Sequence, residues 1–171
     1  MTASGIFAGA ARRASNKDHL KSSERVGECF GIVVVLLLTL FFLENQMQHT
    51  GFFTARFGVT ESLLFYGSAL FGAVTMASRS LLGRRNAVRP LEVFGTLLWT
   101  FTSYWFLQVF PFDVAHFPDL LPGVVRFLFW WLTNETARLL LLIGVIAGPL
   151  QAIYTTLLFL AVRRMQKEEH R

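Results

Sequence analysis

The chain has 171 residues, of which 53% are hydrophobic and only 16% are charged, and its formal net charge is +5. The hydrophobic residues come in long blocks, a distribution that argues against an ordinary soluble domain and indicates an integral membrane protein. The single cysteine, Cys29, excludes an intrachain disulfide framework.

Apolar runs of about 18 to 25 residues predict membrane-spanning helices, because a helix satisfies its backbone hydrogen bonds internally. Residues 1–25 precede the first run and carry five basic residues. We expect them to form a basic cytoplasmic arm that is either mobile or lies on the membrane surface. A membrane domain is predicted over residues 26–165, followed by a charged cytoplasmic tail at 166–171. Its spans are expected at about residues 26–46, 61–82, 91–110 and 136–162.

The apolar stretch from 120 to 165 is too long for one span. A straight helix of that length would reach about 70 Å, against a hydrocarbon core of about 30 Å. Thr133 or Asn134 can cap a new helix, so the last span is expected to start near residue 136. Segment 120–133 is too short to cross and contains Trp130 and Trp131, which favour the membrane interface. The predicted fold is therefore an all-α integral membrane protein, a four-transmembrane-helix bundle with a short interfacial or re-entrant helix before the last span.

The basic residues are unevenly distributed along the chain. Thirteen of the 16 lysines and arginines lie in the arm, around the connector between spans two and three, or in the C-terminal segment 162–171, and only Arg56, Arg126 and Arg138 lie elsewhere. This asymmetry predicts that both termini are cytoplasmic, in a plasma membrane if the source is prokaryotic or alternatively in an organelle inner membrane. The expected partners of these charges are the bilayer's anionic lipid headgroups, so the net charge requires no nucleic acid.

Small residues recur at helical spacing in two of the predicted spans. A GxxxG motif in the last span, extended by one alanine, allows close approach of helix backbones in lipid. The same packing can join helices within one chain or between copies of the chain, and the sequence leaves both alternatives open. The helix-packing residues are Ala69, Gly72, Ala73 and Ala77 in span two and Gly144, Gly148 and Ala152 in span four.

Polar residues inside the spans are few. Thr96, Thr100 and Ser103 share one face of span three by their spacing, and this face is expected to point inward or toward another helix. In span four, Pro149 predicts a kink, and Gln151 follows it. A broken helix with a polar neighbour is typical of a transporter's substrate site, but proline kinks also occur in bundles that transport nothing.

One polar segment outside the spans has the pattern D-x-x-H-x-x-D, formed by Asp113, His116 and Asp119. Such spacing can ligate a divalent cation, but the prolines nearby favour ordinary turns and caps at a water boundary. These residues are weak metal candidates, and we assign no catalytic residue, no metal and no cofactor. Sequence signatures such as CxxC, GxSxG or a phosphate-binding loop are missing.

Three functional hypotheses follow. The first is a protein without catalytic machinery that acts by helix association, as a homo-oligomer or as a subunit of a membrane complex. The second is a small oligomeric channel or transporter. The third is an interfacial metal-dependent enzyme built around His116.

Overall fold

The computed structural model describes residue 9 and residues 12–169. Helix accounts for 82% of the chain, and the described part contains no strand, which confirms the all-α prediction. The four long helices are α2 (Ser22–Met47), α3 (Val59–Leu82), α4 (Arg85–Val109) and α6 (Asn134–Glu169). The shorter elements between α4 and α6 are η1 (Val114–Leu120), α5 (Gly123–Arg126) and η2 (Phe127–Phe129).

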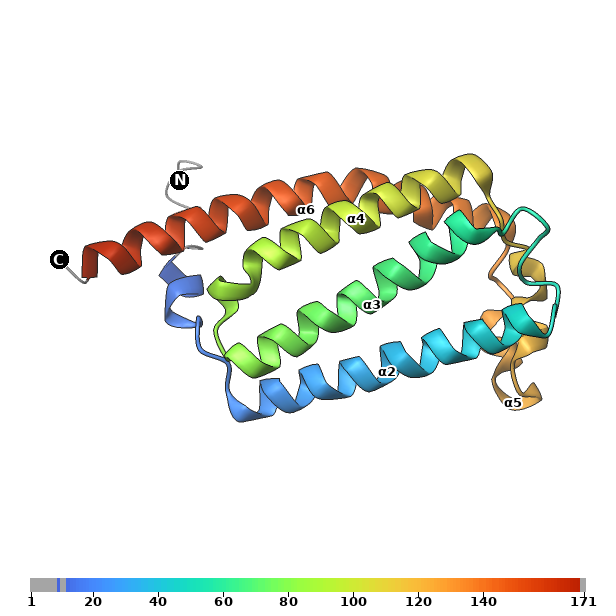
Figure 1. Ribbon diagram of the computed structural model, residues 1–171, viewed down its shortest axis with the longest axis horizontal. Helices are drawn as coiled ribbons and strands as arrows, with labels where there is room; N and C mark the ends of the chain where they lie inside the picture. Colours follow the sequence, from blue (N-terminus) through green and yellow to red (C-terminus); the bar gives the residue numbers. More distant parts are fainter. Residues whose placement is uncertain (1–8, 10–11, 170–171) are drawn as a thin grey trace.

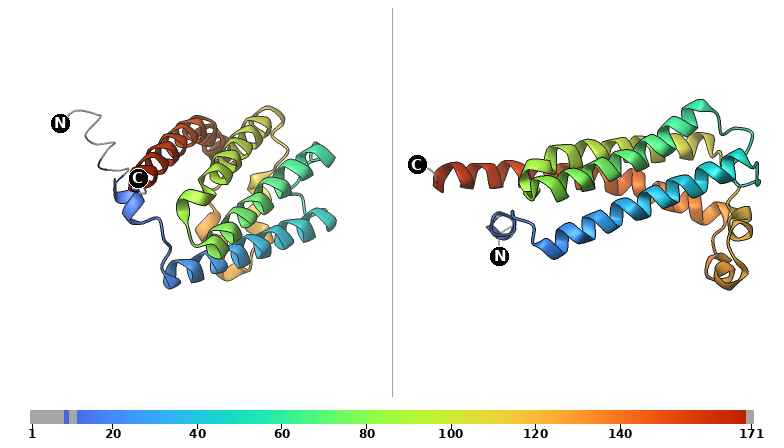
Figure 2. Two further views of the ribbon diagram at one scale, coloured as in Figure 1. Left: turned by 60° about the vertical axis from the view of Figure 1, so that its left-hand side comes forward. Right: turned by 60° about the horizontal axis from the view of Figure 1, so that its bottom comes forward.

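The long helices run alternately in opposite directions and form a curved row (Figures 1 and 2). Each packs against the next along the chain, and the interface between α4 and α6 is the most extensive. The start of α2, the α3–α4 connector and the last described turns of α6 therefore lie at one end of the helices, which we call the basic end (Figure 1). The α2–α3 connector and the short elements lie at the other end, which we call the aromatic end (Figure 1).

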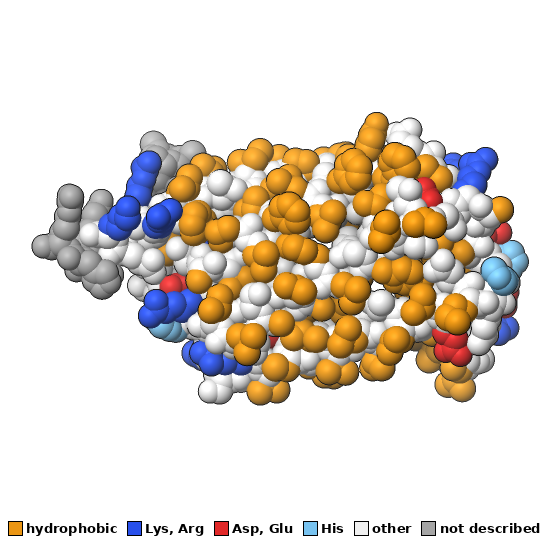
Figure 3. Space-filling model, in the orientation of Figure 1, with side chains coloured by type: hydrophobic (Ala, Val, Ile, Leu, Met, Phe, Trp, Pro, Cys, Tyr) orange, Lys and Arg blue, Asp and Glu red, His pale blue; other side chains and the backbone are white. Residues whose placement is uncertain are grey.

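Three of the described helices, α2, α3 and α6, are long and apolar enough to cross a membrane. Helix α4 is similar in length but less apolar, because hydroxyl and indole side chains are interspersed among its apolar residues. It packs between α3 and α6, so two of its faces contact protein. Apolar side chains cover the sides of the helices, and Lys and Arg gather mainly at the basic end (Figure 3).

The aromatic end contains the main hydrophobic core, in which Phe52, Phe106, Phe112 and Val114 are buried. Two backbone hydrogen bonds join the α2–α3 connector to the segment after α4. The Asp113 N–H donates to the Phe52 carbonyl (2.7 Å), and the Thr54 N–H donates to the Pro111 carbonyl (3.0 Å). The connector is thus held by backbone pairing as well as by aromatic packing.

At the basic end, part of the predicted arm is attached to the helices. The Leu20 N–H donates to the Gly83 carbonyl (2.9 Å), and the Arg85 N–H donates to the Asp18 carbonyl (2.8 Å). Residues 22–25 of the arm form the first turn of α2, and 166–169 of the predicted tail continue α6. What the sequence predicts for residues 1–8, 10–11 and 170–171 lies outside the described residues.

Replacing Phe106 by alanine tests the aromatic core. Phe106 is 3% exposed, whereas Phe101 on the same helix is 52% exposed. We expect Phe106→Ala to lower the free energy of unfolding by about 3–5 kcal/mol, because it leaves a cavity in a packed core. Phe101→Ala should change it far less. Thermal unfolding in detergent, followed by circular dichroism, measures both, and equal losses would contradict this description of the core.

Candidate functional site: a polar groove between α3, α4 and α6

A cavity of about 470 Å³ lies between α3, α4 and α6. We call it the polar groove. It opens to the surroundings, because Gln151 and Trp99 line it while remaining exposed. Its polar lining residues are Ser68, Thr75, Arg79, Glu92, Thr96, Gln151 and Thr155.

Helical spacing explains how a mostly apolar chain builds this lining. On α3, the residues Ser68, Gly72, Thr75 and Arg79 follow one another at intervals of three or four and therefore share one face. Glycines supply the space, since a residue without a side chain leaves room beside the backbone. Those that line the groove are Gly72, Gly95, Gly144 and Gly148.

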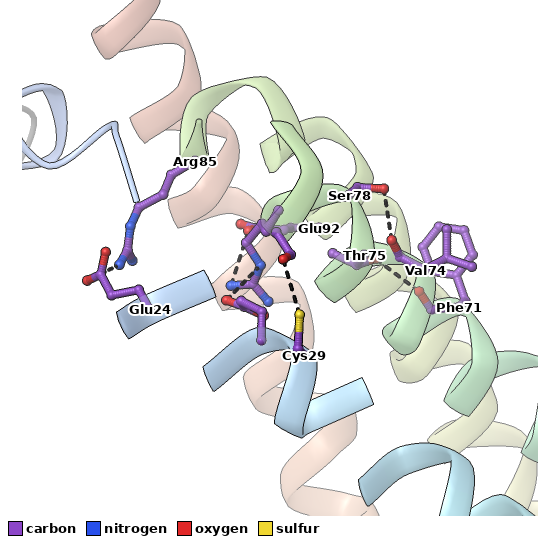
Figure 4. Close-up of polar contacts among 11 residues, drawn as sticks. Glu24, Cys29, Phe71, Val74, Thr75, Ser78, Arg85 and Glu92 are labelled. Atoms are coloured by element: carbon purple, nitrogen blue, oxygen red, sulfur yellow. Dashed lines mark hydrogen bonds and ion pairs between the residues drawn. The ribbon is translucent and has the colours of Figure 1, made fainter. Parts of the chain in front are cut away.

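Two of the three threonine hydroxyls that line the groove bond to their own helices. Thr75 Oγ1 donates to the Phe71 carbonyl (3.0 Å), and Thr96 Oγ1 donates to the Glu92 carbonyl (2.8 Å). The first of these bonds is drawn in Figure 4. Each hydroxyl thereby uses its hydrogen and keeps lone pairs that can accept a bond from a ligand. The groove wall consequently presents acceptors along its length.

The amide of Gln151 supplies both donors and an acceptor. Within the part of the chain that the structure describes, it makes no hydrogen bond.

Helix α6 continues through Pro149 without a break. The proline therefore removes one backbone donor, leaving the Val145 carbonyl without its usual helical partner, but it does not divide the helix into two halves.

The groove ends, toward the basic end, at a group of three charges. Arg79 lies between two carboxylates, with Nε 3.4 Å from Glu28 Oε1 and Nη1 3.5 Å from Glu92 Oε1. These side chains come from α3, α2 and α4, so the ion pairs connect three helices. All three are partly buried. The charge of the guanidinium is thus compensated inside the protein.

Sequence reasoning missed this triad, although its members are visible there. Each of the three lies within a turn or two of a helix end on the basic side, where an interfacial charge is unremarkable by itself. What the sequence does not indicate is that the three helix ends converge.

The GxxxG residues face α4 within the same chain. A side chain at Gly144 would place its Cβ 3.0 Å from Ser103 Oγ, and one at Gly148 would collide with Thr100 Oγ1. Ala152 continues this face and is buried. The glycine stripe of α6 therefore packs against the hydroxyl stripe of α4, so the two predicted motifs contact each other.

The alanine stripe of α3 belongs to a different interface. Tyr66 and Ser80 contact α2, through Gln46 (2.8 Å) and Cys29 (3.4 Å) respectively. Ala69, Ala73 and Ala77 occupy the same side of α3 by helical spacing, and Ala73 is buried. Gly72 lies on the groove instead. Both small-residue stripes are thus engaged within the chain.

The three weak metal candidates have protein partners. Asp113 Oδ2 lies 3.1 Å from His116 Nδ1, whereas Asp119 Oδ1 lies 3.4 Å from Arg126 Nη1. Among the residues described, no three His, Cys, Asp or Glu side chains are grouped so that they could hold a metal ion. The structure therefore does not bring the three candidates together into one site.

Comparison with models of known protein families finds no match, and searches of curated proteins and of solved structures likewise find none. The function must be inferred from the chemistry of the groove.

A matched pair of glycine substitutions tests the α4–α6 contact. We expect Gly148→Ala to lower the free energy of unfolding by about 1–3 kcal/mol, because the new methyl group collides with Thr100. Gly67→Ala meets open space on α3 and should stabilise the protein by up to about 1 kcal/mol through helix propensity. Thermal unfolding in detergent compares the two.

A Thr100→Ala substitution removes the atom nearest to the new methyl group. It should therefore partly restore the stability of Gly148→Ala. If Gly148→Ala and Gly67→Ala behave alike, the two helices are not in the close contact described.

Proposed function

We propose that the chain is a membrane protein of four spans, with α4 as the fourth span in addition to α2, α3 and α6. Its 25 residues correspond to about 37 Å of helix, which exceeds the thickness of a hydrocarbon core of about 30 Å. Its neighbours α3 and α6 shelter its polar residues. The concentration of Lys and Arg supports a cytoplasmic location for the basic end, and with it for both termini.

We further propose that the polar groove admits a small uncharged solute, and that the protein works as a channel or carrier without catalytic machinery. The observation that carries this proposal is a cavity of about 470 Å³ lined by hydroxyl and amide groups between otherwise apolar helices. Ligand sites in proteins commonly enclose about 300–1,000 Å³. Polar groups within a bilayer are costly, and they are typically retained where they serve a function.

The solute class follows from the charges of the lining. Gln151, Thr96 and Thr155 are uncharged, whereas the charged residues Arg79 and Glu92 are ion-paired with each other. The negative charge left over in the group of Glu28, Arg79 and Glu92 lies at the end of the groove, so a charged solute would find no counter-charge beside the amide and the hydroxyls. A neutral molecule with several hydroxyl or amide groups would exchange hydrogen bonds with water for bonds with the wall.

The groove is open, so it does not enclose a pore by itself. A second copy of the chain or another membrane protein would complete the wall, which is consistent with an oligomeric channel.

Flux measurements test this proposal. We expect vesicles containing the protein to take up glycerol faster than protein-free vesicles after an osmotic shock. Gln151→Leu and Thr155→Val should each slow uptake about five- to tenfold, the effect of losing one hydrogen bond of about 1–1.5 kcal/mol. Stopped-flow light scattering measures the rates.

The matched control is Thr156→Val, because Thr156 does not line the groove and its hydroxyl bonds to the Ala152 carbonyl (2.8 Å). It should leave glycerol uptake unchanged. Uptake no faster than in protein-free vesicles, or an equal slowing by Thr155→Val and Thr156→Val, would count against solute passage through the groove.

A second candidate function is association with a partner through the open side of the groove. The supporting observation is that Ala147 and Gln151 line the groove and are exposed, which leaves its polar lining accessible to a neighbouring helix. This differs from association through Gly144 and Gly148, since those residues already pack against α4.

Bulky substitutions test the association. If a second copy covers the groove, Ala147→Trp should reduce the oligomer to a monomer in detergent, because the indole occupies the contact. Ile146→Trp is the control, since Ile146 is exposed but lies outside the groove. Light scattering measures the mass, and an unchanged oligomer in Ala147→Trp would exclude this surface as the interface between copies.

A further inference from the structure

We propose that a second pocket, at the basic end, binds the phosphate group of an anionic ligand. This basic pocket has a volume of about 730 Å³ and lies between residues 15–19, the start of α4 and the last turns of α6. It is separate from the polar groove, and the inference does not depend on solute transport. The residues that carry the argument are Asp18, His19, Arg84, Phe159, Arg163 and Lys167.

The charge of the lining is the first argument. Arg84, Arg163 and Lys167 contribute three positive charges and Asp18 one negative charge. Over the described residues, no carboxylate forms an ion pair with any of these three cations. His19 adds a hydrogen-bond donor. The pocket thus has an excess of positive charge, which an anion would neutralise.

Asp18 is not available to pair with the three cations, because both its carboxylate oxygens accept other hydrogen bonds. Oδ1 accepts the backbone N–H of Asn86 (2.6 Å), and Oδ2 accepts Nε2 of Gln166 (3.1 Å). The first bond caps the start of α4, and the second attaches the end of α6. The single acidic group of the pocket therefore serves to hold three chain segments together.

The pocket is held in shape by contacts between segments far apart in the sequence. His19 and Arg84 face each other in an isolated antiparallel bridge. Arg89 is also buried, and its Nη1 donates to Asn86 Oδ1 (2.7 Å) and to the Leu158 carbonyl (3.3 Å). A preformed site binds its ligand at a smaller entropic cost.

The location favours a phosphate attached to an apolar body. Phe159 forms part of the wall, and the guanidinium of Arg163 lies over its ring at 6.0 Å from the centroid. The cations gather where the apolar sides of the helices end (Figure 3). A phospholipid headgroup would place its phosphate among the cations and its chains along α6. A free phosphate group would use the cations alone, so both sources share the same recognition chemistry.

Lipid titration tests the pocket. Full-length protein in neutral detergent is titrated with phosphatidylglycerol, with phosphatidylcholine and with inorganic phosphate, and binding is followed by native mass spectrometry. We compare wild type with Arg163→Gln/Lys167→Gln. Each basic residue at a membrane surface contributes about fivefold in affinity, so the double variant should bind phosphatidylglycerol about 25-fold more weakly.

The matched control is Arg12→Gln/Arg13→Gln, which removes the same charge from exposed residues at the same end but outside the pocket. It should change the affinity much less. The charge-preserving variant Arg163→Lys/Lys167→Arg should retain binding, which separates loss of the site from loss of the fold.

The three titrations distinguish the ligand source. Pocket-dependent binding of phosphatidylglycerol without competition by phosphate identifies a lipid site, whereas competition by millimolar phosphate identifies a site for the phosphate group alone. Equal weakening by the pocket variant and the control, or phosphatidylcholine binding as tightly as phosphatidylglycerol, would overturn the proposal.

Discussion

The close approach of α4 and α6 is the contact on which the rest of the structure depends. Gly144 and Gly148 bring the backbone of α6 next to Thr100 and Ser103 of α4. In lipid no hydrophobic force drives helices together, because the lipid tails are as apolar as the helix surfaces. Helices therefore associate through dispersion and close packing. Small residues opposite hydroxyl-bearing residues therefore fix where the two helices meet, and α3 and then α2 continue the row from α4.

The same glycines explain why a groove exists. They allow α6 to contact α4 closely. They also leave space between α6 and α3, where the groove lies. The polar residues of α3 and α4 then line this space instead of facing outward. Helix α4 tolerates its lower apolar content because α3 and α6 cover two of its faces. Packing and polar lining are thus two consequences of one arrangement, and the proposed solute site follows from both.

The two ends of the molecule are held by different interactions. Phe52, Phe106 and Phe112 pack at the aromatic end, where dispersion dominates and backbone pairing fixes the connector. At the basic end, Asp18 and Arg89 are buried and hydrogen-bonded. The hydrogen bonds of Asp18 and Arg89 hold the segments together without using Arg84, Arg163 or Lys167, so these cations can bind an anion. The aromatic core contains no such cations. The proposed phosphate pocket accordingly lies at the basic end.

The sequence by itself determined the all-α class, and it predicted the packing and hydroxyl stripes, because apolar run length and helical spacing are local properties. Only the tertiary structure decided that Gly148 meets Thr100, that Arg79 joins Glu28 to Glu92, and that Asp18 contacts both Asn86 and Gln166. Periodicity specifies the face on which a residue lies, but not the helix that this face contacts. Partner choice depends on the packing of all helices together, and it brings residues as far apart as 18 and 166 into one site.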